Sequence, residues 1–86
     1  MYADHYSVEI TKKLSKLRKK DPTHFSKVKK KMETILNNPD HDYKQLRYDM
    51  KGLNRIHLGH FVLIFVIDHE KKAVSFEDYD HHDNIY

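Results

Sequence analysis

Apolar and polar residues alternate in the first segment of the chain. Tyr6, Val8 and Ile10 are separated by single polar residues. A period of two is typical of a strand that buries one face. The pattern therefore predicts a short first strand over residues 6–10.

The residues that follow have the spacing of an amphipathic helix. Thr11 is a suitable N-cap, and Leu14 and Leu17 then share one face, while basic residues occupy most of the remaining surface. Asp21-Pro22 ends this helix, because a residue that precedes proline disfavours helical geometry.

A second helix is predicted between Thr23, which can cap it, and the Asn-Asn-Pro of residues 37–39, which stops it. Lysines fill its outward positions. We assign its apolar stripe to core packing: Phe25, Val28, Met32, Ile35 and Leu36. The two helices would form a hairpin with a basic outer surface.

The second half of the chain has the pattern of strands joined by turns. Residues 40–52 lack a clear period and are expected to form a loop, with a short turn or strand around Leu46. The unbroken apolar run Phe61–Ile67 predicts a central strand covered on both faces. Ala73–His81 predicts a last strand, with two sets of side chains on opposite sides: Val74 and Phe76 against Ser75, Glu77 and Tyr79.

The strand predicted over Leu53–Leu58 is the most informative. Its alternation places Ile56 and Leu58 on the core side and Arg55 and His57 on the other. A cationic face is thereby separated from the apolar one.

The predicted order of elements is β-α-α-β-β-β. This order indicates an α+β fold, in which two N-terminal helices pack on an antiparallel sheet of three to four strands. At 86 residues the chain has room for a single domain, residues 1–86. Without cysteine, its stability must come from apolar packing.

Charge is distributed unevenly along the chain. Residues 1–39 hold ten Lys and Arg against four Asp and Glu, and residues 40–86 hold six against nine. A basic surplus favours a polyanionic partner, although lysine-rich helices are often simply solvated faces. Because the longest apolar run is too short to cross a bilayer and the first residues include Asp4 and His5 in place of a signal sequence, we expect a cytoplasmic protein.

Several short segments, in this order and spacing, resemble the RelE/ParE toxin superfamily, and especially its RelE-like branch of mRNA interferases. The resemblance extends over nearly the whole chain. The segments that carry it are Tyr6–Ile10 with the lysine-rich helix after it, Ile35–Pro39, Tyr43–Arg47, Lys51–Phe61 and His81–Tyr86.

The resemblance implies the toxin of a type II toxin–antitoxin system. The implied activity is ribosome-dependent cleavage of mRNA without a metal or a cofactor. The implied partners are a RelB-like antitoxin, which wraps the toxin and masks its basic face, and the ribosome with its mRNA.

Three positions depart from the family pattern. A second basic residue usually stands where this chain has His57, an Arg where it has Val62, and a His-Arg pair where it has His81-His82. In family members that cleave RNA, the Arg at the position of Val62 often holds the scissile phosphate. The departures bear on catalysis more than on the fold.

RNA cleavage by 2′-hydroxyl attack needs a proton acceptor, a cation for the developing phosphorane charge and a proton donor for the leaving oxygen. Arg55 is the best candidate for the phosphate, because its guanidinium is always charged and forked. His57, His81 and His82 are candidates for proton transfer. Tyr86 resembles the terminal aromatic that the family places near the reacting 2′-oxygen, and it can also stack a base.

Lys44, Arg47 and Lys51 are expected to bind RNA together with Arg55. The acidic residues from Glu77 to Asp83 would repel RNA if they lined the same groove, unless they face away or pair with lysines.

Other interpretations stay open at this point. A ParE-like protein would bind gyrase, a degenerate toxin would bind only protein, and a plain RNA-binding module would bind without cutting. The histidines also permit a metal site at His57-x-x-His60 or at His81-His82-Asp83, although no further ligand spacing reinforces it, and we expect none.

Overall fold

The computed structural model describes residues 1–45 and 52–85, which form a five-stranded sheet and three helices. None of the helices described is long and apolar enough to cross a membrane. In chain order the elements are β1 (Ala3–Tyr6), α1 (Val8–Lys20), α2 (Pro22–Asn37), β2 (Lys44–Gln45), β3 (Asn54–Leu58), β4 (Phe61–Asp68), β5 (Ala73–His81) and α3 (His82–Ile85).

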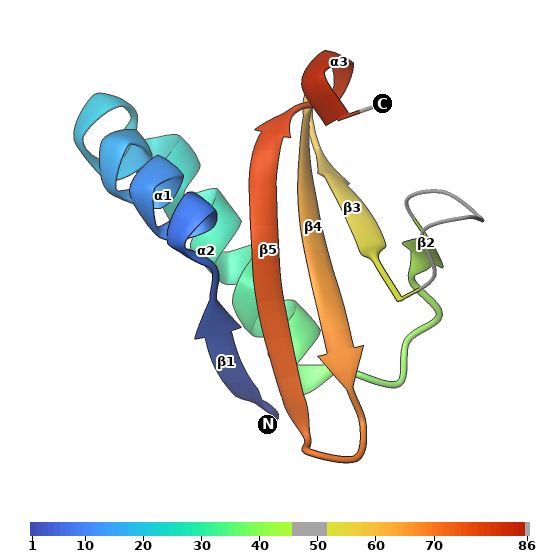
Figure 1. Cartoon of the computed structure of the whole chain (residues 1–86). Coiled ribbons are helices and arrows are strands. Elements are labelled where there is room, and N and C mark those ends of the chain that lie inside the picture. The colour runs from blue at the N-terminus through green and yellow to red at the C-terminus, as the bar shows by residue number, and fades with distance from the viewer. Residues whose placement is uncertain (46–51, 86) are drawn as a thin grey trace.

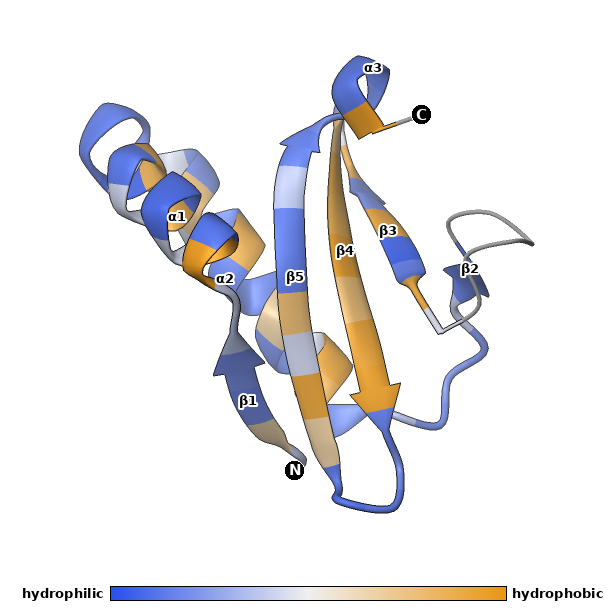
Figure 2. Cartoon of the chain, viewed as in Figure 1, coloured by the Kyte–Doolittle hydropathy of each residue, from blue (hydrophilic) through white to orange (hydrophobic). Residues whose placement is uncertain are grey.

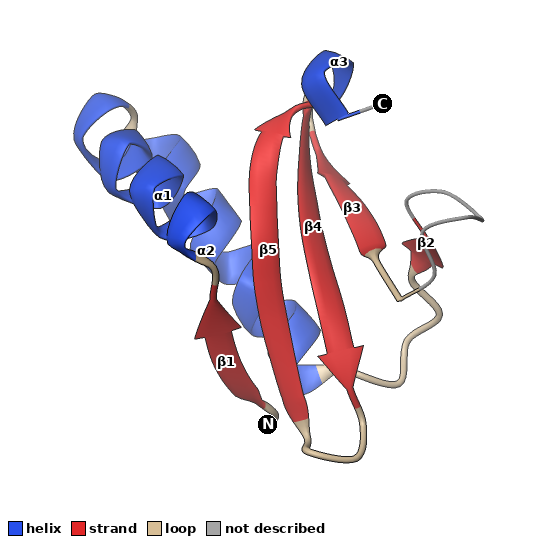
Figure 3. Ribbon diagram, viewed as in Figure 1, coloured by secondary structure: helices blue, strands red, loops and turns tan. Residues whose placement is uncertain are grey.

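The strands are ordered β1-β5-β4-β3-β2, and α1 and α2 lie together on one side of the sheet (Figures 1 and 3). The predicted α+β class and the packing of two N-terminal helices on the sheet are confirmed. The predicted number of strands and the purely antiparallel pairing are wrong. β1 returns beside β5 in a parallel pair, and β2 adds an edge strand next to β3.

The first strand ends earlier than predicted, at Tyr6, because Ser7 begins a helix. Its Oγ accepts a hydrogen bond from the Ile10 N–H at 3.0 Å and donates one to the Glu77 carbonyl at 2.6 Å. Ser7, and not Thr11, is therefore the N-cap of α1. Val8 is 73% exposed on the first turn, whereas Ile10 is buried as a helical residue.

The start of α2 also differs from the prediction. Asp21, and not Thr23, is the N-cap, and its carboxylate accepts from the His24 N–H at 3.1 Å. Pro22 occupies the first turn, where no N–H is needed. The helix ends at Asn37, as the Asn-Asn-Pro sequence predicts.

β4 is the central strand, and it is apolar along nearly its whole length (Figure 2). Leu63 and Phe65 face the two helices and belong to the main core, and Val62 and Ile64 are buried on the opposite face. This confirms that the run Phe61–Ile67 is covered on both sides.

A β-bulge changes which side chains of β5 are buried. Ile64 pairs with Asp78 while Phe65 pairs with Phe76, so Glu77 is the extra residue. The alternation of β5 therefore shifts by one after Phe76, and Tyr79 becomes a core residue that is only 4% exposed. The prediction that Tyr79 lies opposite Phe76 is wrong for this reason.

One lysine of α1 fastens the helix to the acidic end of β5. Nζ of Lys13 lies 2.8 Å from a carboxylate oxygen of Asp78 and 3.0 Å from one of Asp80. Burial opposes the charge on Lys13, but the two carboxylates outweigh it and raise the pKa of its ammonium. The hydrogen bond from Asn84, followed by that from Lys13, lowers the pKa of Asp80.

Lys13→Met is expected to lower the free energy of unfolding by about 1 kcal/mol or less at neutral pH, since all three groups are partly exposed. The stabilisation is present above the unfolded pKa of Asp80 and below that of Lys13. It is lost as the pH falls through the lowered folded pKa of Asp80 or rises through the raised pKa of Lys13. Urea denaturation at neutral and acidic pH measures it. Lys16→Met, on the same helix, is the control, and an equal effect of both variants would contradict the account.

Candidate functional site

The register of the sheet gathers cationic side chains on the face opposite the two long helices. Lys44 pairs with Arg55 across β2 and β3, and Arg55 pairs with Ile64 of β4. His57 pairs with Val62 on the same face, because residues two apart on a strand point the same way. The predicted separation of Arg55 and His57 from Ile56 and Leu58 is therefore present: the two apolar residues pack against the core.

A hollow of about 310 Å³ lies beside this cationic face. Arg55 is partly buried, and Lys44 and His57 are exposed. His41 also lines this hollow and was not predicted, although it stands only three residues before Lys44 in the sequence. The hollow is lined by His41, Asp42, Tyr43, Lys44, Arg55, Ile56 and His57.

The segment that carries Lys44 is anchored by an aromatic residue. The Tyr43 ring packs edge-on against Phe65, with centroids 5.1 Å apart, and its hydroxyl donates to the Asn38 carbonyl at 2.9 Å. Burial raises the pKa of Tyr43. The hollow therefore has a fixed wall between α2 and β2.

His81 is placed on the other face of the sheet. It pairs with Phe61 and lies two residues beyond the buried Tyr79, and its ring meets the Phe61 ring edge-on at 5.6 Å. His82 starts α3, beyond the end of β5. The structure thus brings Lys44, Arg55 and His57 together, while His81 faces the helix side.

The short α3, at the upper end of the sheet in Figure 1, lies against β4 and β5. Asn84 donates to a carboxylate oxygen of Asp80 at 3.0 Å. Asn84 and Ile85 also line a hollow of about 520 Å³ together with Ile64 and Val66 of β4. The C-terminal helix therefore returns to the face that carries Arg55.

Two acidic side chains of β5 share this face, since Asp78 pairs with Ile64 and Asp80 with Val62. Both carboxylates bind Lys13. Of the two arrangements expected for the acidic tail, pairing with lysine is the one found for these residues.

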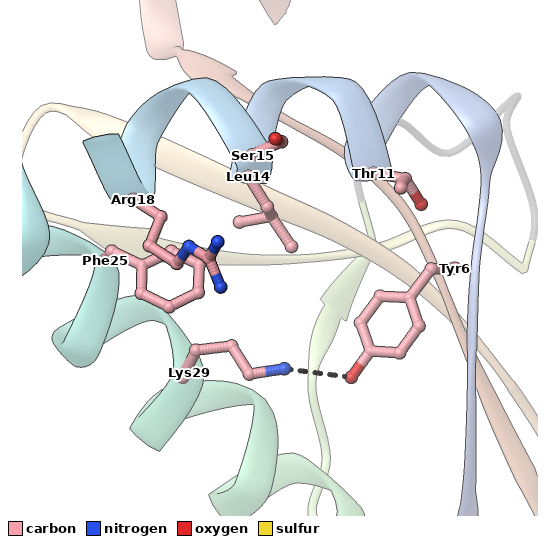
Figure 4. A pocket seen from close by; sticks show the side chains of 7 residues that line it. All are labelled: Tyr6, Thr11, Leu14, Ser15, Arg18, Phe25 and Lys29. Atoms are coloured by element: carbon pink, nitrogen blue, oxygen red, sulfur yellow. Dashed lines mark hydrogen bonds between the residues drawn. The ribbon is translucent and has the colours of Figure 1, made fainter. Parts of the chain in front are cut away.

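A second basic groove, which the sequence analysis did not identify, lies between α1 and α2. It has a volume of about 340 Å³, and Arg18, Lys29 and Phe25 line it (Figure 4). Lys29 donates to the Tyr6 hydroxyl at 3.3 Å, and that hydroxyl donates to Asp4 at 2.7 Å. Burial and the bond to Asp4 raise the pKa of Tyr6 to about 12.

Three predicted site residues, Arg47, Lys51 and Tyr86, lie outside the described residues, as does Leu46. Their assignments stay predictions.

Comparison with known proteins gives both sequence relatives and structural neighbours, although no family model matches the chain. A Methanocaldococcus jannaschii protein named "Putative toxin RelE4" is 44% identical over 87 aligned positions, which cover 100% of this chain and 92% of the relative. A Methanosarcina mazei protein is 45% identical over 87 positions and covers 100% of both chains.

Solved structures share the fold at lower identity. The isolated E. coli RelE toxin superposes with a TM-score of 0.79 at 23% identity, over 94% of this chain and 84% of that one. The toxin–antitoxin complex RelBE2 from Mycobacterium tuberculosis gives a TM-score of 0.76 at 23% identity, over 93% and 96%.

Val62 is 0% exposed. An arginine at this position would either bury its charge or push the neighbouring side chains apart. Val62→Arg is expected to lower the free energy of unfolding by about 2 kcal/mol or more. Val66→Arg is the control, because Val66 lies on the same face but is only partly buried. Urea denaturation measures both, and equal losses would show that the burial of Val62 is not the cause.

Proposed function

We propose, since this chain belongs to the RelE family of toxins, that it is the toxin of a type II toxin–antitoxin pair and cleaves mRNA on the ribosome. Membership rests on the 44% identity over the full chain to the Methanocaldococcus jannaschii relative. The observation that carries the proposed site is the register that aligns Lys44, Arg55 and His57 on one face.

The proposed reaction is attack of a ribose 2′-hydroxyl on the adjacent phosphate, with loss of the 5′-oxygen. Arg55 would bind the scissile phosphate and stabilise the charge that develops on it, because preorganised donors act most strongly where charge appears. Its partly buried stem, in a strand held by β2 and β4, supports this role. The reaction needs no cofactor and no metal ion.

The remaining roles follow the same chemistry. His57 lies two residues from Arg55 on the same face, so it is the first candidate for proton transfer. His82 and Tyr86 are proposed to complete the catalytic set from the C-terminal end, whereas His81 faces the helix side of the sheet, away from Arg55. Lys44, Arg47 and Lys51 are proposed to bind the RNA backbone beside Arg55.

The proposed partners are a RelB-like antitoxin and the ribosome with its mRNA. The fold neighbours include the RelBE2 toxin–antitoxin complex and the intact E. coli RelBE complex. β1 and β2 are the outermost strands of the described sheet, and an extended antitoxin segment can pair with such an edge. The antitoxin would then cover basic surface that otherwise meets RNA. We place the protein in the cytoplasm, where both partners are found.

The burial of Val62 favours one alternative, a family member that binds its partners without cutting RNA. A hydrophobic side chain fills the place where the resemblance leads one to expect a phosphate-binding Arg. Such a protein would act through protein binding, with gyrase or the antitoxin as its partner, or through RNA binding alone.

Arg55→Ala is expected to reduce ribosome-dependent cleavage at least about 100-fold, since it removes the main charge-stabilising donor. Arg55→Lys should retain an intermediate activity, because it keeps the charge but loses the forked geometry. Primer extension on translated messages after induced expression measures the cuts.

Arg18→Ala is the matched control, because it removes the same charge from the groove between α1 and α2. It should leave the cuts unchanged. If Arg55→Ala retains full cleavage while the fold is intact, the proposed site is wrong. If the wild type arrests growth without cuts, the non-cleaving alternative is favoured.

A further inference from the structure

Three metal-ligating side chains converge where β5 meets α3. One ligand atom from each of His81, His82 and Asp83 lies within 4.8 Å of the other two. An oxygen of Asp83 is 3.1 Å from Nε2 of His82, and the second oxygen is 3.5 Å from Nδ1 of His81. The carboxylate therefore lies between the two imidazoles. Among the residues that the structure describes, this is the group of three that could hold an ion.

The backbone under these ligands is held in place by its neighbours. The His82 N–H donates to the His60 carbonyl at 2.9 Å, and the His81 N–H donates to Asp80 at 2.7 Å. Asp80 is itself held by Lys13 and Asn84, each at 3.0 Å. Contacts outside the group thus hold the backbone of the turn from which the ligands project.

Nδ1 of His81 lies beside Asp83 and makes one hydrogen bond with it. It accepts this hydrogen bond from the Asp83 N–H at 3.3 Å, which requires an unprotonated nitrogen on that side. Because this nitrogen has a single lone pair, an ion bound to it would replace the hydrogen bond from Asp83. The side chains of His81, His82 and Asp83 are 37%, 44% and 71% exposed, so an ion can reach them from solvent.

We propose that His81, His82 and Asp83 bind one divalent transition-metal ion of the zinc class. Two imidazole nitrogens and one carboxylate oxygen suit such ions, whereas Mg²⁺ and Ca²⁺ prefer oxygen ligands alone. Three protein ligands leave a fourth position for water. The ion joins the end of β5 to α3 and so stabilises the C-terminal segment. The test of this proposal measures Zn²⁺ binding and not RNA cleavage, so either proposal can fail alone. The site does use His82, and a bound ion would compete with the proton-transfer role proposed for that residue.

The test is titration of the untagged full chain with Zn²⁺ alone, followed by calorimetry and by thermal unfolding. The expected result is one ion per chain, together with a rise in Tm of about 5 °C or more at saturating Zn²⁺. Asp83→Asn and His81→Gln each remove one ligand while keeping a similar shape. Each is expected to weaken binding at least about 10-fold and to abolish most of the rise in Tm.

His69→Gln is the matched control. His69 lies in the turn between β4 and β5, at the far end of the sheet, and its Nδ1 is 3.8 Å from an Asp40 oxygen. A single imidazole–carboxylate pair offers too few ligands, so this variant should bind Zn²⁺ like the wild type. Absence of saturable binding up to about 100 µM Zn²⁺, or binding that Asp83→Asn and His81→Gln leave unchanged, would overturn the proposal.

Discussion

Pairing of β4 with β3 on one side and β5 on the other determines on which face of the sheet Arg55, His57 and His81 lie. The β3–β4 register places Arg55 opposite Ile64 and His57 opposite Val62. The β4–β5 register then adds Asp78 and Asp80 to the same face. A slip of one residue in either ladder would send these charged groups into the core under α1 and α2. The alternation of β3 and of the end of β5 opposes such a slip, because Ile56, Leu58 and Tyr79 pack on the core side and would be turned out of it.

The acidic side chains on the described part of this face are bound by residues of the neighbouring helices. Lys13 reaches from α1 to Asp78 and Asp80, and Asn84 reaches Asp80 from α3. The acidic groups nearest to Arg55 in the sheet are thereby engaged by neighbouring elements. The same contacts hold the turn that carries His81, His82 and Asp83, so one small network supports both the proposed RNA site and the proposed metal site.

Residue patterns in the sequence were sufficient for the order of the main elements and for the cationic face of β3. Long apolar runs and an Asn-Asn-Pro stop are local signals that tertiary context rarely overrides. The alternation at residues 6–10 predicted a strand, but Ile10 fits the apolar face of a strand and of a helix equally well. The hydrogen bond from the Ile10 N–H to Ser7 starts the helix instead. The side of Tyr79 was unpredictable, since a bulge at Glu77 depends on the partner strand and not on local sequence.

The other features that could not be predicted depend on contacts between residues far apart in the sequence. The parallel return of β1 to β5 joins residues about seventy positions apart, and nothing near Ala3 indicates it. His41 enters the hollow only because Tyr43 anchors its segment on Phe65 and Asn38. The opposite facing of His81 and Arg55 likewise follows from pairing across three strands, which spacing along the chain does not specify.

The most direct test of the central claim uses the purified chain and a defined mRNA, either free or bound to programmed ribosomes, with new 5′ ends mapped in both reactions. We expect cleavage of the ribosome-bound message and little or none of the free RNA. A folded chain that binds the programmed ribosomes but produces no new ends in either reaction would contradict the claim.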